Sequence, residues 1–358
     1  ELSNTEEDML DTVCSQFDNV IVVVNANNAM ELDWVDKYEQ IGAVIFAPGA
    51  GATGFEALGE IINGSVNPSG KTVDTFVTET PYYNNMGLNA YTNVEDLKEQ
   101  IAANDPAYEG SMGFVNYAEG IYVGYKFYET AAEEGLIKYE DMVQYPFGYG
   151  LSYTTFDKQI ENFKDNGDTV TFDVTVENTG SVAGKDVVEI YYTAPYTNGG
   201  IEKAAANLIA FEKTDSIEPG ESQTKSFTIN KEDMASYDSE GIKISGGGYI
   251  LEAGEYTISL RSDSHTVLGE EKFTVDEDID YSKDGRSSDK TVATNQFEDY
   301  ARGDFEQLSR EDGFANYDKA CGVPEEDAYV MSDETRAAVE ENVFGIYDGT
   351  KYNNDSDE

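Results

Sequence analysis

The sequence predicts an α/β region followed by an all-β sandwich. Residues 1–156 contain continuous apolar runs separated by helical patterns, which is typical of parallel strands buried on both faces. Residues 157–275 contain short strands that alternate apolar and polar side chains, with regular turns between them. Residues 276–358 are acidic and lack sustained apolar periods, so we expect an irregular connector with one helix near residues 332–344.

The first region follows an order of helix, strand, helix, strand and helix. A helix is expected after Ser3, which has Glu6 at capping-box spacing. Val20–Val24 and Ala43–Phe46 are the expected strands, with a short helical segment between them. A further helix with one apolar face is expected to end at Asn63–Gly64, a normal C-terminal signal. Strands that alternate with helices imply right-handed crossovers and a partial parallel sheet.

The glycine-rich loop after the second strand invites a nucleotide-binding interpretation. Gly49, Gly51 and Gly54 spell G-x-G-x-x-G between a strand and a helix. The acidic residue expected some 20 residues further on is missing, because that part of the chain is Asn67–Lys71. No second nucleotide-binding half follows, so we interpret the loop as a tight strand-to-helix turn.

The second region predicts an immunoglobulin or fibronectin type III-like sandwich. Val170–Val176 and Val188–Tyr192 alternate with a period of two. Further short apolar runs lie at Leu208–Phe211, Phe227–Ile229, Tyr249–Leu251, Tyr256–Leu260 and Lys272–Val275. About seven short strands with Gly- and Asn-containing turns between them are typical of this architecture.

Composition excludes several classes of function. The formal net charge of −48, from 71 acidic and 23 basic residues, disfavours nucleic acid and anionic membrane partners. The only histidine, His265, allows no His-based triad, and Cys14 and Cys321 have no metal or redox spacing, so we expect no metal and no cofactor. No apolar run is long enough to cross a membrane. Few cysteines and strong acidity favour an exported bacterial protein.

Five residues are candidates for lining a cleft. Asn27, Asn28 and Gly49 follow the carboxyl ends of the two predicted parallel strands, where open α/β sheets bind their ligands. Tyr82 and Tyr83 lie in a Tyr-, Asn- and Gly-rich segment. Tyrosine rings of this density can stack on sugars or pack between domains, and both interpretations remain open.

Several ordered motifs resemble glycoside hydrolase family 3. Asn67–Lys71 is followed by Glu119–Lys126, by Tyr145–Phe156, and by Asn178–Gly180 in the sandwich. Together they resemble the C-terminal α/β sandwich and the fibronectin type III-like domain of β-glucosidase-like members. The sequence departs from the family pattern at the first strand end, where Asn27 and nearby Ala29 replace glycine and proline, and at Ala50 and Thr72–Val73.

The end of the chain resembles a domain-permuted member of the family. Thr294–Phe297 and Leu308–Phe314 look like a connector that leads into a catalytic barrel, so we expect a barrel after Glu358. The resemblance implies retaining hydrolysis by an aspartate nucleophile and a glutamate acid/base. Both catalytic carboxylates are then expected outside this chain, which makes it a fragment that is inactive alone. The full-length enzyme would act on a β-glucoside or an oligosaccharide.

Three carboxylates within the chain have structural explanations. Glu31 and Asp33 suit the start of a helix, and Glu119 suits a packing or hydrogen-bonding role. A competing hypothesis is a non-catalytic carbohydrate-binding or adhesion module, and the coding sequence on either side of the chain would discriminate the two. A third is a fragment without a stable fold, because a parallel sheet that lacks its first strand has an exposed edge.

Overall fold

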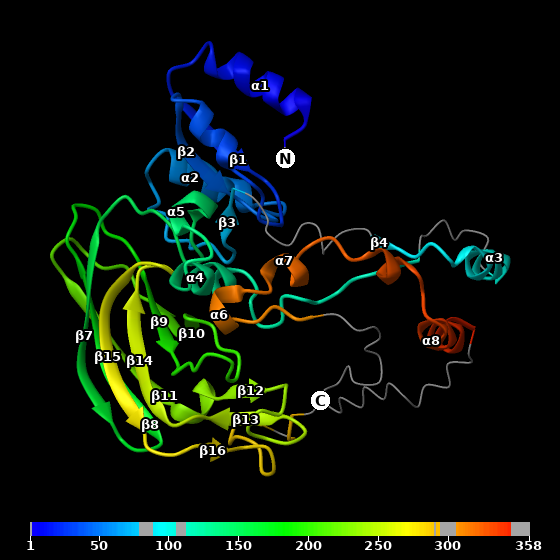
Figure 1. The fold of residues 1–358 in the computed structure, drawn as a ribbon. Coiled ribbons are helices and arrows are strands. Elements are labelled where there is room, and N and C mark those ends of the chain that lie inside the picture. Colours follow the sequence, from blue (N-terminus) through cyan, green and yellow to red (C-terminus); the bar gives the residue numbers. More distant parts are fainter. Residues whose placement is uncertain (1, 79–88, 105–111, 290, 294–305, 345–358) are drawn as a thin grey trace. The chain divides into compact units, whose positions relative to one another are not determined.

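The computed structural model describes residues 2–78, 89–104, 112–289, 291–293 and 306–344 (Figure 1). These residues belong to two compact units. The main unit comprises residues 1–80, 121–294 and 310–315, and the smaller unit comprises residues 81–120, 295–309 and 316–358. The main unit holds an α/β region and a β-sandwich, which confirms the predicted fold class of α/β plus all-β.

The α/β region is built around a two-stranded parallel sheet. Its elements are α1 (Asn4–Cys14), β1 (Val20–Val24), the 3₁₀-helix η1 (Asp33–Lys37), β2 (Ile41–Phe46) and α2 (Gly54–Ile62). Val20 pairs with Ile41 at one end of the sheet and Val24 pairs with Phe46 at the other. The helix after Ser3 forms as predicted, with the Ser3–Glu6 capping box closed by both partners.

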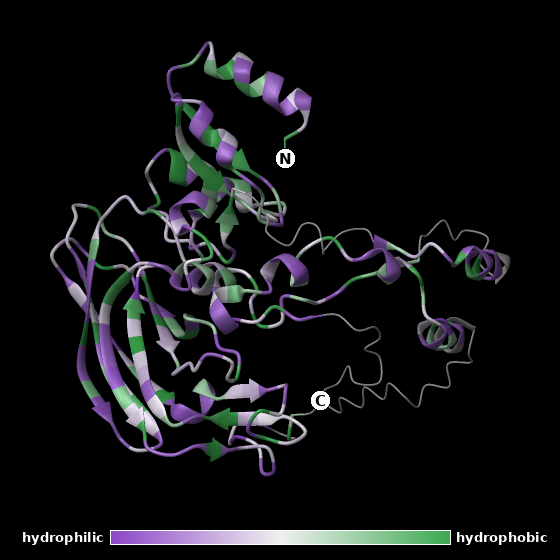
Figure 2. Ribbon diagram, in the orientation of Figure 1, coloured by the Kyte–Doolittle hydropathy of each residue, from purple (hydrophilic) through white to green (hydrophobic). Residues whose placement is uncertain are grey.

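This parallel sheet is covered on only part of its surface. Its core cluster consists of Leu10, Val24, Leu32, Trp34, Val35 and Phe76. By contrast, α2 contains no buried residue. Its apolar side chain Phe55, for example, is 50% exposed. Figure 2 shows hydrophobic residues along both strands. Parallel strands with such continuous apolar runs are normally covered on both faces.

The β-sandwich consists of two facing sheets (Figure 1), and buried residues from both form one core cluster. One sheet has the order β11-β8-β7, from β7 (Phe156–Asp165), β8 (Thr169–Asn178) and β11 (Ser222–Asn230). The other has the order β10-β9-β14-β15, from β9 (Val187–Thr193), β10 (Asn207–Lys213), β14 (Gly254–Arg261) and β15 (Val267–Val275). A small sheet adds β12 (Ser236–Asp238), β13 (Gly248–Leu251) and β16 (Ile279–Asp280). All pairings in these sheets are antiparallel, as the alternation predicts.

The sequence pattern did not reveal β7. Its apolar residues Phe156, Ile160 and Phe163 are separated by four and then three positions, not by two. The register of β7 against β8 shifts between Glu161 and Lys164, and Asn162 within this bulge has φ of +55°. One extra residue in a bulge moves the following side chains to the other face, so the period of two is lost.

A helical segment connects the α/β region to the sandwich. It contains α4 (Tyr125–Glu133), α5 (Tyr139–Met142) and β6 (Val143–Tyr145), and β6 pairs with β3 (Phe76–Val77). Tyr122 and Tyr128 are buried, and the Tyr125 hydroxyl accepts a hydrogen bond from the Leu208 amide. These tyrosines therefore serve packing.

The smaller unit combines short elements from distant parts of the chain. They are β4 (Asn89–Ala90), α3 (Glu95–Asn104), β5 (Gly113–Phe114), α7 (Tyr317–Ala320), η3 (Glu326–Tyr329) and α8 (Asp333–Phe344). The Asn93 side chain donates to the Met331 carbonyl and accepts from the Met331 amide. The α8 helix occupies the range in which the sequence predicts one. Two further short helices, η2 (Lys231–Met234) and α6 (Glu311–Phe314), belong to the main unit.

Candidate functional site

The loops after β1 and β2 leave the parallel sheet at the same edge. Asn27 and Asn28 are exposed in the first loop, and Gly49 in the second has φ of +56°, a conformation that favours glycine. A Cβ atom on Gly49 would lie 3.6 Å from Asn27 Oδ1. Asn27 and Gly49 therefore lie together at the edge where the sequence places its cleft. Tyr82 and Tyr83 lie outside the described residues.

Glu31 and Asp33, two of the carboxylates considered from the sequence, flank the start of η1. The Glu31 carbonyl accepts a hydrogen bond from Trp34 Nε1. Asp33 opens η1 and lies 3.8 Å from the Lys37 ammonium, with both side chains largely exposed. Within the described part of the chain, no cluster of His, Cys, Asp and Glu side chains could hold a metal ion. No helix among the described residues is both long and apolar enough to cross a membrane.

The two most distinctive sequence motifs bind each other. We call Asn67–Lys71 together with Tyr145–Phe156 the junction. Asn67 Oδ1 accepts hydrogen bonds from Ser152 Oγ at 3.0 Å and from the Tyr153 amide at 2.8 Å. Asn67 Nδ2 donates to the Ala183 carbonyl at 3.1 Å. A single amide side chain thus ties the segment after α2 to the start of the sandwich and to the loop before β9.

Lys71 extends the junction into the sandwich. Its ammonium donates to the Gly150 carbonyl and lies 3.3 Å from Asp186 Oδ1, while Lys158 lies 3.0 Å from Asp186 Oδ2. Burial opposes ionisation of Asp186, but the two ammonium groups outweigh it, so the pKa of Asp186 lies below its ordinary value. A Cβ atom on Gly150 would overlap the Gly70 carbonyl oxygen, so only glycine allows these two segments to approach so closely.

A buried carboxylate lies beside the junction on β9. Glu189 is 3% exposed, and its Oε2 accepts a hydrogen bond from the Tyr191 hydroxyl at 2.9 Å. A Cβ atom on Gly148 would overlap this carboxylate, so the glycine leaves room for it. Burial raises the pKa of Glu189 to about 7, against smaller opposing effects of the Tyr191 hydrogen bond and of Lys71 and Lys158.

A second buried carboxylate connects α4 to the loop between β14 and β15. Glu129 accepts from Ser264 Oγ at 2.9 Å, and its other oxygen lies 2.9 Å from His265 Nδ1. The His265 ring stacks on Tyr139 with a centroid separation of 3.6 Å. The hydrogen bond with Glu129 raises the pKa of His265 above its ordinary value.

Sequence reasoning did not identify Glu129, Asp186 or Glu189. The available signal was a charged residue at a position that the strand or helix pattern buries, as for Glu189 within the apolar run of β9. Buried carboxylates need hydrogen-bond or ionic partners, and these partners come from distant segments. The described contacts of all three residues hold segments together, so they give the junction and its surroundings a structural role.

Two family models match the chain. The model described as "Glycosyl hydrolase family 3 C-terminal domain" matches residues 1–125, and the model described as "Fibronectin type III-like domain" matches residues 186–264. These ranges fall on the α/β region and on the sandwich.

Curated relatives are named as β-glucosidases. "Beta-glucosidase A" from Butyrivibrio fibrisolvens is 38% identical over 274 residues, covering 72% of this chain and 30% of the relative. "Beta-glucosidase" from Ruminococcus albus is 33% identical over 275 residues, covering 77% of this chain and 26% of the relative. The chain therefore spans less than a third of the length of these relatives.

Solved structures of similar proteins share the fold. β-Glucosidase 3B from Thermotoga neapolitana, in complex with glucose, superposes with a TM-score of 0.62 at 30% identity, over 78% of this chain and 35% of that chain. A β-glucosidase from Paenibacillus barengoltzii gives a TM-score of 0.63 at 31% identity, over 78% of this chain and 29% of that chain.

Proposed function

This chain belongs to glycoside hydrolase family 3, and from that we propose that it is the non-barrel part of a retaining β-glucosidase. The main support is its match to about 30% of a β-glucosidase from Butyrivibrio fibrisolvens. In this proposal the aspartate nucleophile and the glutamate acid/base lie elsewhere in the polypeptide. A retaining mechanism needs these two carboxyl groups about 5 Å apart. The 358 residues alone would therefore not hydrolyse a glucoside.

The chain would contribute a cleft edge and the frame that holds it. Asn27, exposed beside Gly49 at the carboxyl edge of the sheet, can donate to and accept from sugar hydroxyls. The junction ties the α/β region to the sandwich through the hydrogen bonds of Asn67. The exposed apolar side chains of α2 and the partly covered parallel sheet suit contact with the rest of the enzyme.

We place the barrel after the connector, as in a domain-permuted member. The connector segment at residues 310–315 is anchored in the main unit by Arg310, which is 5% exposed. Its guanidinium pairs with Glu133 at 2.7 Å and with Glu134 at 2.6 Å, and it donates to the Lys203 carbonyl. Phe314 is buried against Tyr122. A connector held this firmly would give a following domain a defined starting point.

The test compares the 358 residues with the full open reading frame from which they come. We expect a chromogenic β-glucoside to be hydrolysed by the full-length protein and not by the 358 residues. Product NMR should show the β-anomer first, as retention requires. Clear turnover by the isolated chain would contradict the proposal. An open reading frame without a barrel would contradict it as well and would favour a carbohydrate-binding or adhesion module.

A further inference from the structure

One face of the β10-β9-β14-β15 sheet is polar, and it is the face turned away from the sandwich core. On β14, Ile258 and Leu260 are fully buried in the core, whereas Thr257, Ser259 and Arg261 alternate with them on the opposite face. The register continues this polar face onto both neighbouring strands. Thr257 pairs with Thr193 and Lys272, and Ser259 pairs with Tyr191 and Glu270.

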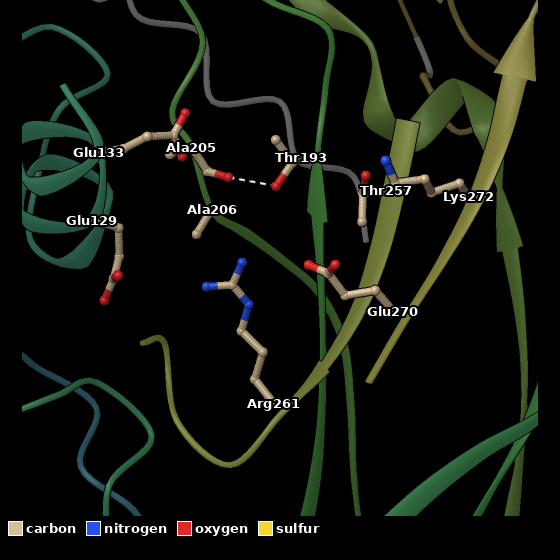
Figure 3. A pocket seen from close by; sticks show the side chains of 9 residues that line it. All are labelled: Glu129, Glu133, Thr193, Ala205, Ala206, Thr257, Arg261, Glu270 and Lys272. Atoms are coloured by element: carbon tan, nitrogen blue, oxygen red, sulfur yellow. Dashed lines mark hydrogen bonds between the residues drawn. The ribbon is translucent and has the colours of Figure 1, made fainter. Parts of the chain in front are cut away.

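A cavity of about 330 Å³ lies on this polar face (Figure 3). Its lining consists of Thr193 from β9, Ala205 and Ala206 from the loop before β10, Thr257 and Arg261 from β14, Glu270 and Lys272 from β15, and Glu129 and Glu133 from α4. All of these residues belong to the main unit. The cavity is therefore built jointly by the helical segment and the sandwich.

Arg261 is the most informative residue of the cavity. Its side chain is buried at 8% exposure, and Figure 3 shows the guanidinium directed into the hollow. Nε donates to Ser259 Oγ and Nη1 to the Ser264 carbonyl, while the group lies 5.3 Å from the Tyr191 ring centroid. Among the described residues, none forms an ion pair with Arg261 and none accepts a hydrogen bond from Nη2. A buried charge of this kind is normally paired, so Nη2 is a fixed donor available to a ligand.

The other groups around the cavity define the ligand class. Three carboxylates and two cations line it, and the whole chain carries −48, so an anion would be repelled. Two alanines supply its only wholly apolar side chains, which disfavours a hydrocarbon ligand. Thr193 Oγ1 donates to the Ala205 carbonyl and keeps its lone pairs for a further donor. Guanidinium donors, carboxylate acceptors and threonine hydroxyls together match the vicinal hydroxyl groups of a neutral sugar.

We propose that the cavity between α4 and the β9-β14-β15 face binds a neutral monosaccharide, with Arg261 Nη2 and the Glu270 carboxylate holding neighbouring hydroxyl groups. The cavity lacks an exposed aromatic platform among its lining residues, so the expected affinity is low, in the millimolar range. The proposal concerns binding by this chain and does not depend on its belonging to an active enzyme.

The test titrates D-glucose into the 358-residue chain, with isothermal calorimetry and saturation-transfer NMR as readouts. Two conservative variants, Glu270→Gln and Thr257→Val, alter the lining while keeping its shape. We expect the double variant to weaken glucose binding by about tenfold or more, since it removes one charged acceptor and one hydroxyl. Glu271→Gln is the matched control, because Glu271 lies on the same strand but on the opposite face of the sheet. Thermal melting checks that each variant is folded.

Three outcomes would overturn the proposal. They are an absence of saturable glucose binding up to about 100 mM, equal binding by the double variant and the Glu271→Gln control, and tighter binding of D-glucuronate than of D-glucose. The last would show that the site prefers an anion. None of these measurements uses turnover. If the sugar-binding proposal fails, the proposed β-glucosidase function is still decided separately, by the assay with the chromogenic β-glucoside.

Discussion

The α/β region and the β-sandwich use similar apolar residues but bury them to different extents. On β8, the four inward-facing side chains from Val170 to Val176 are all at most 2% exposed. On β1, only Val24 is buried, and Ile21 remains 48% exposed. Antiparallel strands close in sequence complete one core, whereas a parallel sheet needs further layers on both faces. The comparison indicates that the β-sandwich completes its own core, whereas the α/β region depends on additional contacts to cover its sheet.

The largest expected difference comes from replacing one isoleucine by alanine in the sandwich and one in the α/β region. Ile190→Ala deletes a fully buried side chain from the sandwich and should lower the free energy of unfolding by about 3–4 kcal/mol. Ile21→Ala deletes a half-exposed side chain and should cost less than about 1 kcal/mol. Urea unfolding followed by circular dichroism measures both. Equal losses would show that the two cores are equally closed.

The next effect concerns pH and a buried carboxylate of the sandwich, Glu189. Because the pKa of Glu189 is about 7 in the folded state and 4.5 ordinarily, its stabilising contribution is complete below about pH 4.5 and is lost as the pH rises through 7. Glu189→Gln removes this loss, so at pH 8 the variant should be more stable than the original chain by about 2–3 kcal/mol. At pH 4 the two should be similar. Unfolding midpoints across this range test the sign, with the exposed Glu177→Gln as control.

A smaller effect should appear where the two bodies are joined. Asn67→Ala removes the three hydrogen bonds to Ser152, Tyr153 and Ala183 and should cost about 2 kcal/mol, since it also leaves partly buried partners unsatisfied. We expect amide hydrogen exchange to accelerate in β1 and β2 while the sandwich keeps its protection. Asn28→Ala, at an exposed loop position, is the control. Uniform acceleration in both bodies would show that they unfold as one unit.

The smallest effect is expected on the surface of the α/β region. Lys37→Ala breaks the exposed pair with Asp33 and should change stability by no more than about 0.5 kcal/mol. Thermal melting at low and high salt provides the measurement. A larger, salt-sensitive loss would show that η1 contributes more to this body than its exposure indicates.

Much of the fold follows from local patterns in the sequence. The Ser3–Glu6 capping box, the run Val20–Val24 and the helix end at Asn63 all lie where short-range spacing places them. The bulge at Asn162 hid β7, because it breaks the alternation that marks a strand. The short helices α6 and α7 were also not predicted, since four residues carry too little periodic signal.

The candidate sites likewise consist of a part that the sequence predicts and a part that it does not. The order of the motifs identified the family, and the rule on strand ends placed Asn27 and Gly49 at one edge of the sheet, where the structure brings them together. The sequence by itself determined the elements, their order and this edge, because each depends on neighbouring residues. Only the tertiary structure decided that Asn67 holds Ser152, that Glu189 is buried beside Gly148, and that Arg261 faces a cavity. These properties depend on burial and on partners from distant segments, which spacing along the chain does not encode.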